Sequence, residues 1–379
     1  MRIGVDIRCL TDDRYSGINE VTHHLLTHLL AIDSSNQYIF FYNSAKAARI
    51  PEFWQPNVTM RGFRYPNRFF NLSLRFLKIV EIDKLIGGVD AFFIPNFLFL
   101  HLSKNCRRIQ LVHDLSFELY PQFFTWKKRL WHYLIGPKQF CEQADQILAI
   151  SENTKGDIIR LYGVDRQKIV VAHPGINDIF FSEITERQKQ RVKEKYRLPE
   201  EFCFSLSNLE PRKNLESLVI AFQRVDRRLS LVIAGAEAWK FRNVYRKAHR
   251  LLTEERIKFL GYVDQADKPA LYALSKAFVY PSMYEGFGLP PLEAMASGAP
   301  VICSQASSLP EAVGEAALLI DPYNTESIVQ AINQLVADPA LGERLRQRGR
   351  LHAANYRWNK RIAPFAQAIA GIAPPGGAV

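Results

Sequence analysis

The sequence predicts two Rossmann-like α/β domains whose parallel sheets face a central cleft. The chain has 379 residues, which is more than one ordinary hydrophobic core holds. Short runs of β-branched and aromatic residues alternate with helical stretches, as in parallel sheets covered by helices on both faces. The highly charged stretch Glu183–Lys195 follows Pro174-Gly175 and interrupts this alternation, so we expect the domain boundary in this region.

The first domain is expected at residues 1–180. A helix over Ile18–Leu30 follows its first strand, because apolar residues recur there at helical spacing. Ligands of such sheets bind beyond the carboxyl ends of the strands, so the segments that follow strands are candidate sites. The buried strands of this domain are predicted at Ile3–Ile7, Tyr38–Tyr42, Ala91–Ile94, Ile109–His113 and Gln146–Ile150.

The second domain is expected at residues 181–355. A C-terminal helix within residues 356–372, centred on Ile362–Ala370, is expected to pack back toward the first domain. The Pro/Gly-rich residues 373–379 are expected to form a disordered tail. The second set of strands is predicted at Val170–Ala172, Phe202–Ser207, Ser230–Ala234, Ile257–Leu260, Ala277–Tyr280, Val301–Cys303 and Ala317–Leu319.

The composition excludes several classes of protein. Hydrophobic residues make up 47% of the chain and charged residues 23%, as in soluble globular proteins. The five cysteines include no C-x-x-C pair, which argues against a disulfide framework or a zinc ribbon and favours a reducing, cytoplasmic compartment. The first strand meets Asp12 and Asp13 too early for a signal peptide, and no run of about 18 apolar residues suggests a transmembrane helix.

The net charge of +11 is concentrated in the first domain. Between Arg61 and Lys138, thirteen basic residues stand against five acidic ones and alternate with aromatic residues such as Phe69, Phe70 and Trp126. Basic and aromatic residues together suit an anionic membrane surface or nucleic acid. A solvated face over an ordinary core explains the same pattern equally well.

The strongest chemical signal is the run Glu-Gly-Phe-Gly-Leu-Pro-Pro-Leu-Glu from Glu285 to Glu293, which follows the strand Ala277–Tyr280 and opens a helix. Gly286 and Gly288 allow the backbone to approach a ligand closely. The N–H groups at the start of the helix can bind a diphosphate or sugar hydroxyls. Two carboxylates at this spacing can contact hydroxyls at opposite ends of one ligand.

This run resembles the E-x7-E element of glycosyltransferase family 4, which has the GT-B fold, and the resemblance covers nearly the whole chain. It implies that the first domain binds the acceptor and the second the nucleotide sugar. It also implies that Glu285 contacts the donor sugar and that Glu293 binds the ribose hydroxyls. The backbone amides expected to contact sugar and phosphate belong to Gly286, Phe287, Gly288 and Leu289.

A second element, Glu-Pro-Arg-Lys-Asn at Glu210–Asn214, follows the strand Phe202–Ser207 and resembles a segment of the same family. Its Arg212 and Lys213 can neutralise a diphosphate leaving group, on which negative charge builds in the transition state. Many relatives have an arginine where Asn208 stands, so here we expect Arg212 to contribute more of this charge.

Two positions of the first domain also resemble family residues. Gly17, in the segment Ser16-Gly-Ile-Asn, resembles the glycine of a loop that lies under the donor phosphates and the acceptor. His113, at the end of a strand, resembles the histidine that contacts the donor sugar. A strand-end histidine with a purely structural role is the alternative. We therefore expect His113, Arg212, Lys213 and Glu285 to be the catalytic residues.

The resemblance implies a retaining glycosyltransferase, in which Glu285 orients the sugar. The segments His113–Phe117, Glu210–Asn214 and Ala234–Trp239 resemble mannosyltransferases of bacterial surface polysaccharides, which implies GDP-mannose as donor and a polysaccharide or lipid-linked acceptor. UDP-sugars and dTDP-rhamnose stay open as donors. The enzyme is expected in the cytoplasm, at the inner face of the plasma membrane.

No cofactor and no metal ion are expected. The sequence has no Asp-x-Asp motif, so Arg212, Lys213 and the helix dipole would stabilise the diphosphate instead. His24 and His28 lie four apart on a helix, but without an H-E-x-x-H pattern a plain helix face is favoured over a metal pair.

Three other functions fit the sequence less well. A nucleotide-sugar 2-epimerase shares the two-domain fold, but the Glu-Gly-Phe-Gly-Leu-Pro run argues against it. A basic nucleic-acid-binding protein would leave that run unexplained, so no nucleic-acid partner is expected. An NAD-dependent oxidoreductase is disfavoured because no G-x-G-x-x-G follows an early strand.

Overall fold

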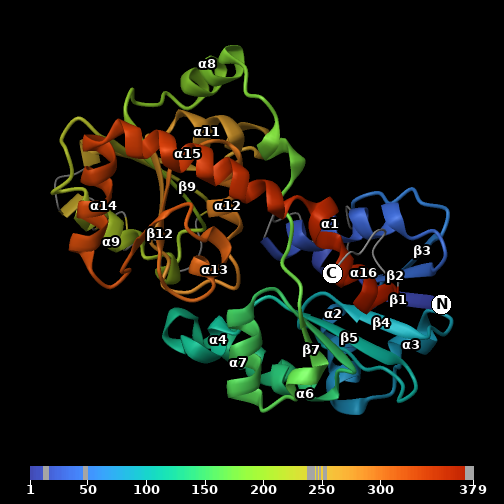
Figure 1. Cartoon of the computed structure of the whole chain (residues 1–379). Helices are drawn as coiled ribbons and strands as arrows, with labels where there is room; N and C mark the ends of the chain where they lie inside the picture. The colour runs from blue at the N-terminus through green and yellow to red at the C-terminus, as the bar shows by residue number, and fades with distance from the viewer. Residues whose placement is uncertain are drawn as a thin grey trace. The chain divides into compact units, whose positions relative to one another are not determined.

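The computed structural model describes residues 1–11, 17–45, 50–236, 244, 246, 249–250 and 254–371. The chain divides into two compact units, each built on its own parallel sheet (Figure 1). The first unit comprises residues 1–119 and 126–175 and the segment from Trp358 onward, and the second comprises residues 120–125 and 176–357. The predicted fold class, two parallel α/β domains, is confirmed.

The sheet of the first unit has the strand order β3-β2-β1-β4-β5-β6-β7, and every neighbouring pair is parallel. All five strands predicted for the first domain are present. Because β1 lies between β2 and β4 and is buried from Ile3 onward, this apolar strand forms part of the core. The strands are β1 Arg2–Asp6, β2 Gln37–Asn43, β3 Val58–Phe63, β4 Ala91–Ile94, β5 Arg107–Val112, β6 Gln146–Ala149 and β7 Ile169–Val171.

The helices of the first unit are mostly short, apart from two long helices that pack on each other. α1 (Gly17–Ile32) buries Leu25, Leu26 and Leu29 on one face, and it contacts α16 (Trp358–Ala370). The remaining helical segments are η1 Arg8–Thr11, α2 Asn67–Leu72, η2 Ser73–Leu77, α3 Ile82–Leu85, α4 Ser116–Leu119, α5 Trp126–Ile135, α6 Pro137–Gln143, α7 Glu152–Tyr162 and η4 Arg166–Lys168.

The sheet of the second unit has the order β10-β9-β8-β11-β12-β13 and is also parallel throughout. Its central strands β8 and β11 are fully buried, as their continuous apolar runs predict. The strands are β8 Phe202–Leu206, β9 Ser230–Ala234, β10 Ile257–Gly261, β11 Ala277–Tyr280, β12 Val301–Ser304 and β13 Leu318–Ile320.

Helices of the second unit include the charged stretch that marks the boundary in the sequence. It forms α8 (Glu186–Lys195), which begins with a capping box at Thr185 and pairs Lys195 with Asp264 and Asp267. The other helical segments are η3 Pro121–Phe123, η5 Asp178–Phe181, η6 Pro211–Lys213, α9 Leu215–Ala221, η7 Glu254–Arg256, η8 Gln265–Asp267, α11 Lys268–Leu274, α12 Leu289–Ala296, α13 Leu309–Val313, α14 Thr325–Ala337, α15 Pro339–Ala353 and η9 Ala354–Tyr356.

The structure differs from the sequence prediction in two strands. β3 was not predicted, because its residues are mostly exposed at the sheet edge and show no apolar run. The strand at Val170–Ala172, grouped with the second set, is β7 and pairs with β6 in the first sheet.

The divisions of the chain also fall at slightly different residues from those expected. Ile176 bridges to Arg357, and apart from residues 120–125 the second unit runs from residue 176 to residue 357. The expected tail, residues 373–379, lies outside the described residues. No helix in the described part of the chain is long and apolar enough to cross a membrane.

Candidate functional site

The predicted Gly-rich run forms the connection between β11 and α12. Gly288 precedes the helix with φ of 143°, a backbone conformation that favours glycine. A Cβ there would also lie 3.0 Å from Leu309 Cδ2, so a larger residue would need this side chain to shift in addition to the strained backbone. Pro290 and Pro291 have no N–H group, so Leu289 supplies the only amide of the first three helical positions.

Two serines before α13 fix this connection from outside. The Glu285 amide donates to Ser307 Oγ at 2.8 Å. Ser308 Oγ lies 2.8 Å from the carbonyl oxygen of Glu285 and 2.7 Å from that of Phe287. Since Ser308 is fully buried, these bonds hold the Gly-rich backbone in one conformation.

The Glu285 carboxylate is the centre of a buried ionic cluster. Its Oε1 accepts from Lys213 Nζ at 2.6 Å, from Ser282 Oγ at 2.6 Å and from the Tyr280 hydroxyl at 2.9 Å. Its Oε2 accepts from Arg212 Nη1 at 2.9 Å. Only 8% of Glu285 is exposed. The structure therefore brings three of the four predicted catalytic residues into direct contact.

These contacts determine the protonation of the cluster. Burial raises the pKa of Glu285, but the positive charges of Arg212 and Lys213 outweigh it and lower the pKa to about 2. Burial lowers the pKa of Lys213, and the neighbouring Arg212 lowers it further, while Glu285 raises it. Burial and the charge of Glu285 raise the pKa of Tyr280 well above its ordinary value, so its hydroxyl keeps its proton.

Arg212 is held from two sides. Its Nε and Nη2 donate to Glu210 Oε1 at 3.1 and 2.7 Å, and its Nη1 donates to the Tyr284 carbonyl at 2.6 Å. Asn214, with φ of 57°, ends the short helix η6 and donates to the carbonyls of Pro281 and Pro322. The loop that carries Arg212 and Lys213 is thereby tied to the segment that follows β11.

Glu293 lies within α12 and is buried. Its Oε2 accepts from the Tyr272 hydroxyl at 2.9 Å, and the Tyr272 ring packs edge-on against Phe204 and Phe278. Glu293 is thus oriented by an aromatic residue of α11. Its expected contact with ribose stays a prediction.

Gly17 and His113 belong to the first unit. Gly17 is the first residue of α1, and a Cβ there would meet no described atom within 4 Å, so packing does not explain the glycine. His113 Nε2 lies 2.9 Å from the Pro95 carbonyl, which can only accept, so Nε2 carries the proton. Burial lowers the pKa of His113, which favours the neutral ring. Their contacts with a donor stay predictions.

The alternative metal pair has a structural explanation. His28 Nδ1 lies 2.8 Å from the His24 carbonyl, and the His28 ring stacks on Trp358 of α16 at 5.7 Å. In the described ranges, no group of three or more His, Cys, Asp or Glu side chains could hold a metal ion.

Sequence reasoning missed the residues that orient the site. Four residues contact the predicted site residues without having been predicted themselves: Glu210, Tyr272, Tyr280 and Ser282. Of these, Glu210 directly precedes the Pro-Arg-Lys run of the second motif. The tyrosines lie in apolar runs that indicate core, and only the tertiary structure shows that their hydroxyls reach carboxylates.

Comparison with known proteins identifies related sequences over both units. The family model described as "Glycosyltransferase Family 4" matches residues 15–179, and that described as "Glycosyl transferases group 1" matches residues 186–352. The "O-antigen chain mannosyltransferase B" of Escherichia coli is 33% identical over 269 residues, which cover 70% of each chain. The "O-antigen chain mannosyltransferase RfbU" of Salmonella typhimurium is 28% identical and covers 59% of each chain.

Solved structures resemble the whole chain in fold. Anabaena Alr3699/HepE, in complex with UDP and glucose, covers 98% of this chain and 100% of its own, with a TM-score of 0.74 and 16% identity. WaaG, a glycosyltransferase involved in lipopolysaccharide biosynthesis, gives the same coverage and TM-score at 14% identity. At these identities the likeness concerns the fold alone.

Proposed function

Because the chain belongs to glycosyltransferase family 4 and has the GT-B fold, we propose that it transfers mannose from GDP-mannose to a polysaccharide or lipid-linked acceptor with retention of anomeric configuration. The cluster of Glu285, Arg212 and Lys213 beside the start of α12 carries this proposal. The relatives named as O-antigen mannosyltransferases support mannose as the sugar and a polysaccharide as the product.

In the proposed reaction, the bond between the anomeric carbon and the β-phosphate oxygen breaks and GDP leaves with the electron pair. Arg212 and Lys213 stabilise the charge that builds on the diphosphate. Because Glu285 holds both cations in place before a donor binds, little reorganisation is needed at the moment of bond cleavage. The Leu289 amide adds a hydrogen-bond donor at the positive end of the α12 dipole.

The acceptor hydroxyl then bonds to the anomeric carbon on the face that the diphosphate leaves, and its proton passes to a phosphate oxygen. Glu285 is unsuited to act as a nucleophile, because four hydrogen bonds occupy its two oxygens and its pKa lies near 2. We propose that it positions the two cations and contacts the sugar. The proposed reaction uses no metal ion, since Arg212 and Lys213 supply the positive charge.

A UDP-sugar is the second candidate donor, because the HepE structure contains UDP and glucose. A 2-epimerase of the same fold is disfavoured by the relatives named as transferases. We further propose that the protein acts at the cytoplasmic face of a membrane. Phe69 and Trp126, which are 73% and 69% exposed among basic residues, support this location.

The donor is identified by a thermal-shift series with GDP, UDP and dTDP, since a ligand that binds only the native state raises the melting temperature. We expect GDP to give the largest shift and Glu293→Gln to reduce it. Proton NMR of the product formed from GDP-α-mannose then tests retention. A β-mannoside as product contradicts the retaining mechanism, and a larger shift with UDP than with GDP contradicts the proposed donor.

A further inference from the structure

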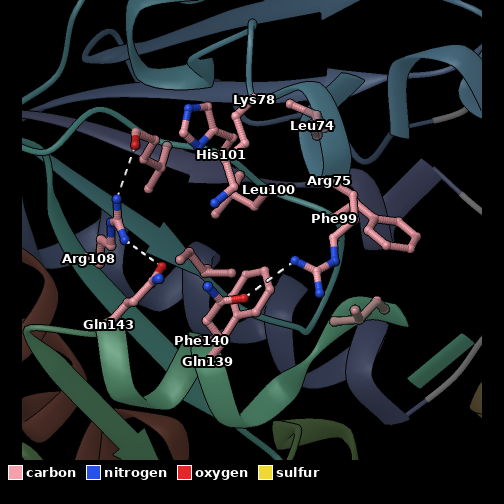
Figure 2. Close-up of a pocket in the computed structure, with 13 residues that line it drawn as sticks. Leu74, Arg75, Lys78, Phe99, Leu100, His101, Arg108, Gln139, Phe140 and Gln143 are labelled. Atoms are coloured by element: carbon pink, nitrogen blue, oxygen red, sulfur yellow. Dashed lines mark hydrogen bonds between the residues drawn. The ribbon is translucent and has the colours of Figure 1, made fainter. Parts of the chain in front are cut away.

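The first unit contains a basic pocket that has no part in the proposed donor site. It has an empty volume of about 620 Å³ that includes open solvent, and Figure 2 shows the side chains around it. The pocket lies among η2, the loop between β4 and β5, and α6. Its charged and polar lining residues are Arg75, Lys78, His101, Arg108, Gln139 and Gln143, and its apolar ones include Leu74, Phe99, Leu100 and Phe140.

The side chains that line this pocket carry net positive charge. Three lining residues are cations, and none of the lining residues is an aspartate or glutamate. Two carboxylates lie just outside the lining: Glu81 forms an ion pair with Lys84, and Asp83 accepts from the amide and hydroxyl of Ser103. A pocket with this lining attracts an anion.

Neutral groups hold the two arginines in place. Arg75 Nε donates to the Leu134 carbonyl at 2.6 Å. Arg108 Nη1 donates to Gln143 Oε1 at 2.8 Å, and its Nη2 donates to the Leu102 carbonyl at 3.0 Å. These bonds orient the guanidinium groups without neutralising them, since carbonyl and amide oxygens carry no net charge. Orientation before binding lowers the entropic cost of capturing a ligand.

Lys78 adds a third cation at the rim. It ends η2 with φ of 50° and is exposed, and within the described residues its ammonium has no hydrogen-bond or ion-pair partner. Burial lowers the pKa of His101, the charge of Glu81 raises it, and the charges of Lys78 and Arg108 lower it. The lysine and the arginine therefore both act on the His101 side of the pocket, where Glu81 offsets part of their charge.

Apolar side chains flank Lys78 on both sides in the sequence. Phe76, Leu77 and Ile79 are 61%, 59% and 73% exposed. Exposed apolar residues next to a cationic pocket suit a ligand that has an anionic end and an apolar chain. A phosphoryl group matches the cations best, because its oxygens accept from forked guanidinium groups and from an ammonium at once.

We propose that this pocket binds the phosphoryl group of an anionic amphiphile, whose apolar chain contacts Phe76, Leu77 and Ile79. The inference goes beyond the proposed function and does not depend on it, because no residue of the proposed donor site lines the pocket.

Binding is measured by isothermal titration calorimetry on the full chain, with geranyl phosphate as the probe. Inorganic phosphate tests the phosphoryl group without a chain, and geraniol tests the chain without charge. We expect saturable binding of one geranyl phosphate per chain, weaker binding of inorganic phosphate, and no binding of geraniol at the same concentrations.

Two charge reversals distinguish binding in the pocket from attraction by charge elsewhere on the surface. Lys78→Glu is expected to weaken geranyl phosphate binding about 10- to 100-fold, the loss typical of a charged hydrogen bond. Lys104→Glu makes the same change at an exposed lysine that does not line the pocket, and binding should change less than about twofold. Leu100→Trp, which fills the pocket without changing charge, should also abolish binding.

A melting temperature without ligand that is unchanged in every variant verifies folding and keeps this test separate from the donor proposal. Absence of saturable geranyl phosphate binding overturns the inference. If Lys78→Glu and Lys104→Glu weaken geranyl phosphate binding equally, the ligand is attracted by general surface charge and the pocket is not its site. If inorganic phosphate binds as tightly as geranyl phosphate, the apolar chain contributes nothing and the proposal of an amphiphilic ligand is wrong.

Discussion

Replacing Glu285 with glutamine removes the negative charge at the centre of the buried cluster while keeping the shape of the side chain. Arg212 and Lys213 then lose the carboxylate that they share, while Glu210 stays paired with Arg212. Breaking a buried ion pair on one side costs about 3–5 kcal/mol, because an uncompensated charge stays in the interior. We expect Glu285→Gln to destabilise the second unit by this amount.

The pKa of Glu285 gives a second magnitude for the same interactions. It falls from an ordinary 4.5 to about 2 in the folded protein, and Glu285 is only 8% exposed, so solvent screens the shift little. A shift of about 2.5 pH units corresponds to roughly 3 kcal/mol of folding free energy. Because the folded pKa is depressed, this contribution is complete above pH 4.5 and is lost as the pH falls toward 2.

The assay is urea unfolding of both proteins, followed at pH 7 and at several values between pH 5 and 3. The free-energy difference between wild type and Glu285→Gln should be largest at pH 7 and should shrink as the pH falls below 4.5. Glu186→Gln is the matched control. Glu186 forms an exposed pair with Lys189 in α8, so its loss should cost no more than about 1 kcal/mol.

A double-mutant cycle tests the pairing itself. Lys213→Met in the Glu285→Gln background removes one of the uncompensated cations, so the double variant should be more stable than the sum of the single effects predicts. A difference below 0.5 kcal/mol between wild type and Glu285→Gln at pH 7, or strict additivity in the cycle, would refute the ionic cluster as the source of stability.

Three further predictions concern function. Glu293→Gln should weaken donor binding by about 1–3 kcal/mol and raise the donor KM, and an unchanged KM in steady-state kinetics removes Glu293 from the site. Lys213→Ala should lower kcat about 10²- to 10³-fold. The wild-type activity should survive EDTA, and activity that is lost to EDTA and restored by magnesium or manganese contradicts the metal-free reaction. The protein should sediment with anionic liposomes, and the sedimented fraction should fall as salt rises. Trp126→Ala should also lower the sedimented fraction. Equal sedimentation with neutral liposomes contradicts an electrostatic contribution to membrane binding.

The sequence predicted the elements of the fold because their patterns are local. Strands such as β8 and β11 are continuous apolar runs, and α12 begins at the glycine and prolines that mark it in the sequence. The edge strand β3 could not be predicted, since an exposed strand needs no apolar pattern. The site was predicted as a set of residues, but two of the partners that orient Arg212, Tyr284 and Glu285, lie 72 and 73 positions away along the chain.

The contacts of Glu285 also bear on the role of the first glutamate of the motif. As a free carboxylate, Glu285 would be a candidate nucleophile for the proposed retaining reaction. In the structure it accepts four hydrogen bonds, and Tyr280, which keeps its proton, donates to the same oxygen as Lys213. Four donors reduce the nucleophilicity of this carboxylate, whereas the same partners suit it to fix two cations beside a leaving diphosphate. Within the proposed reaction, these contacts support attack by the acceptor on the face that the diphosphate leaves rather than a covalent intermediate on Glu285.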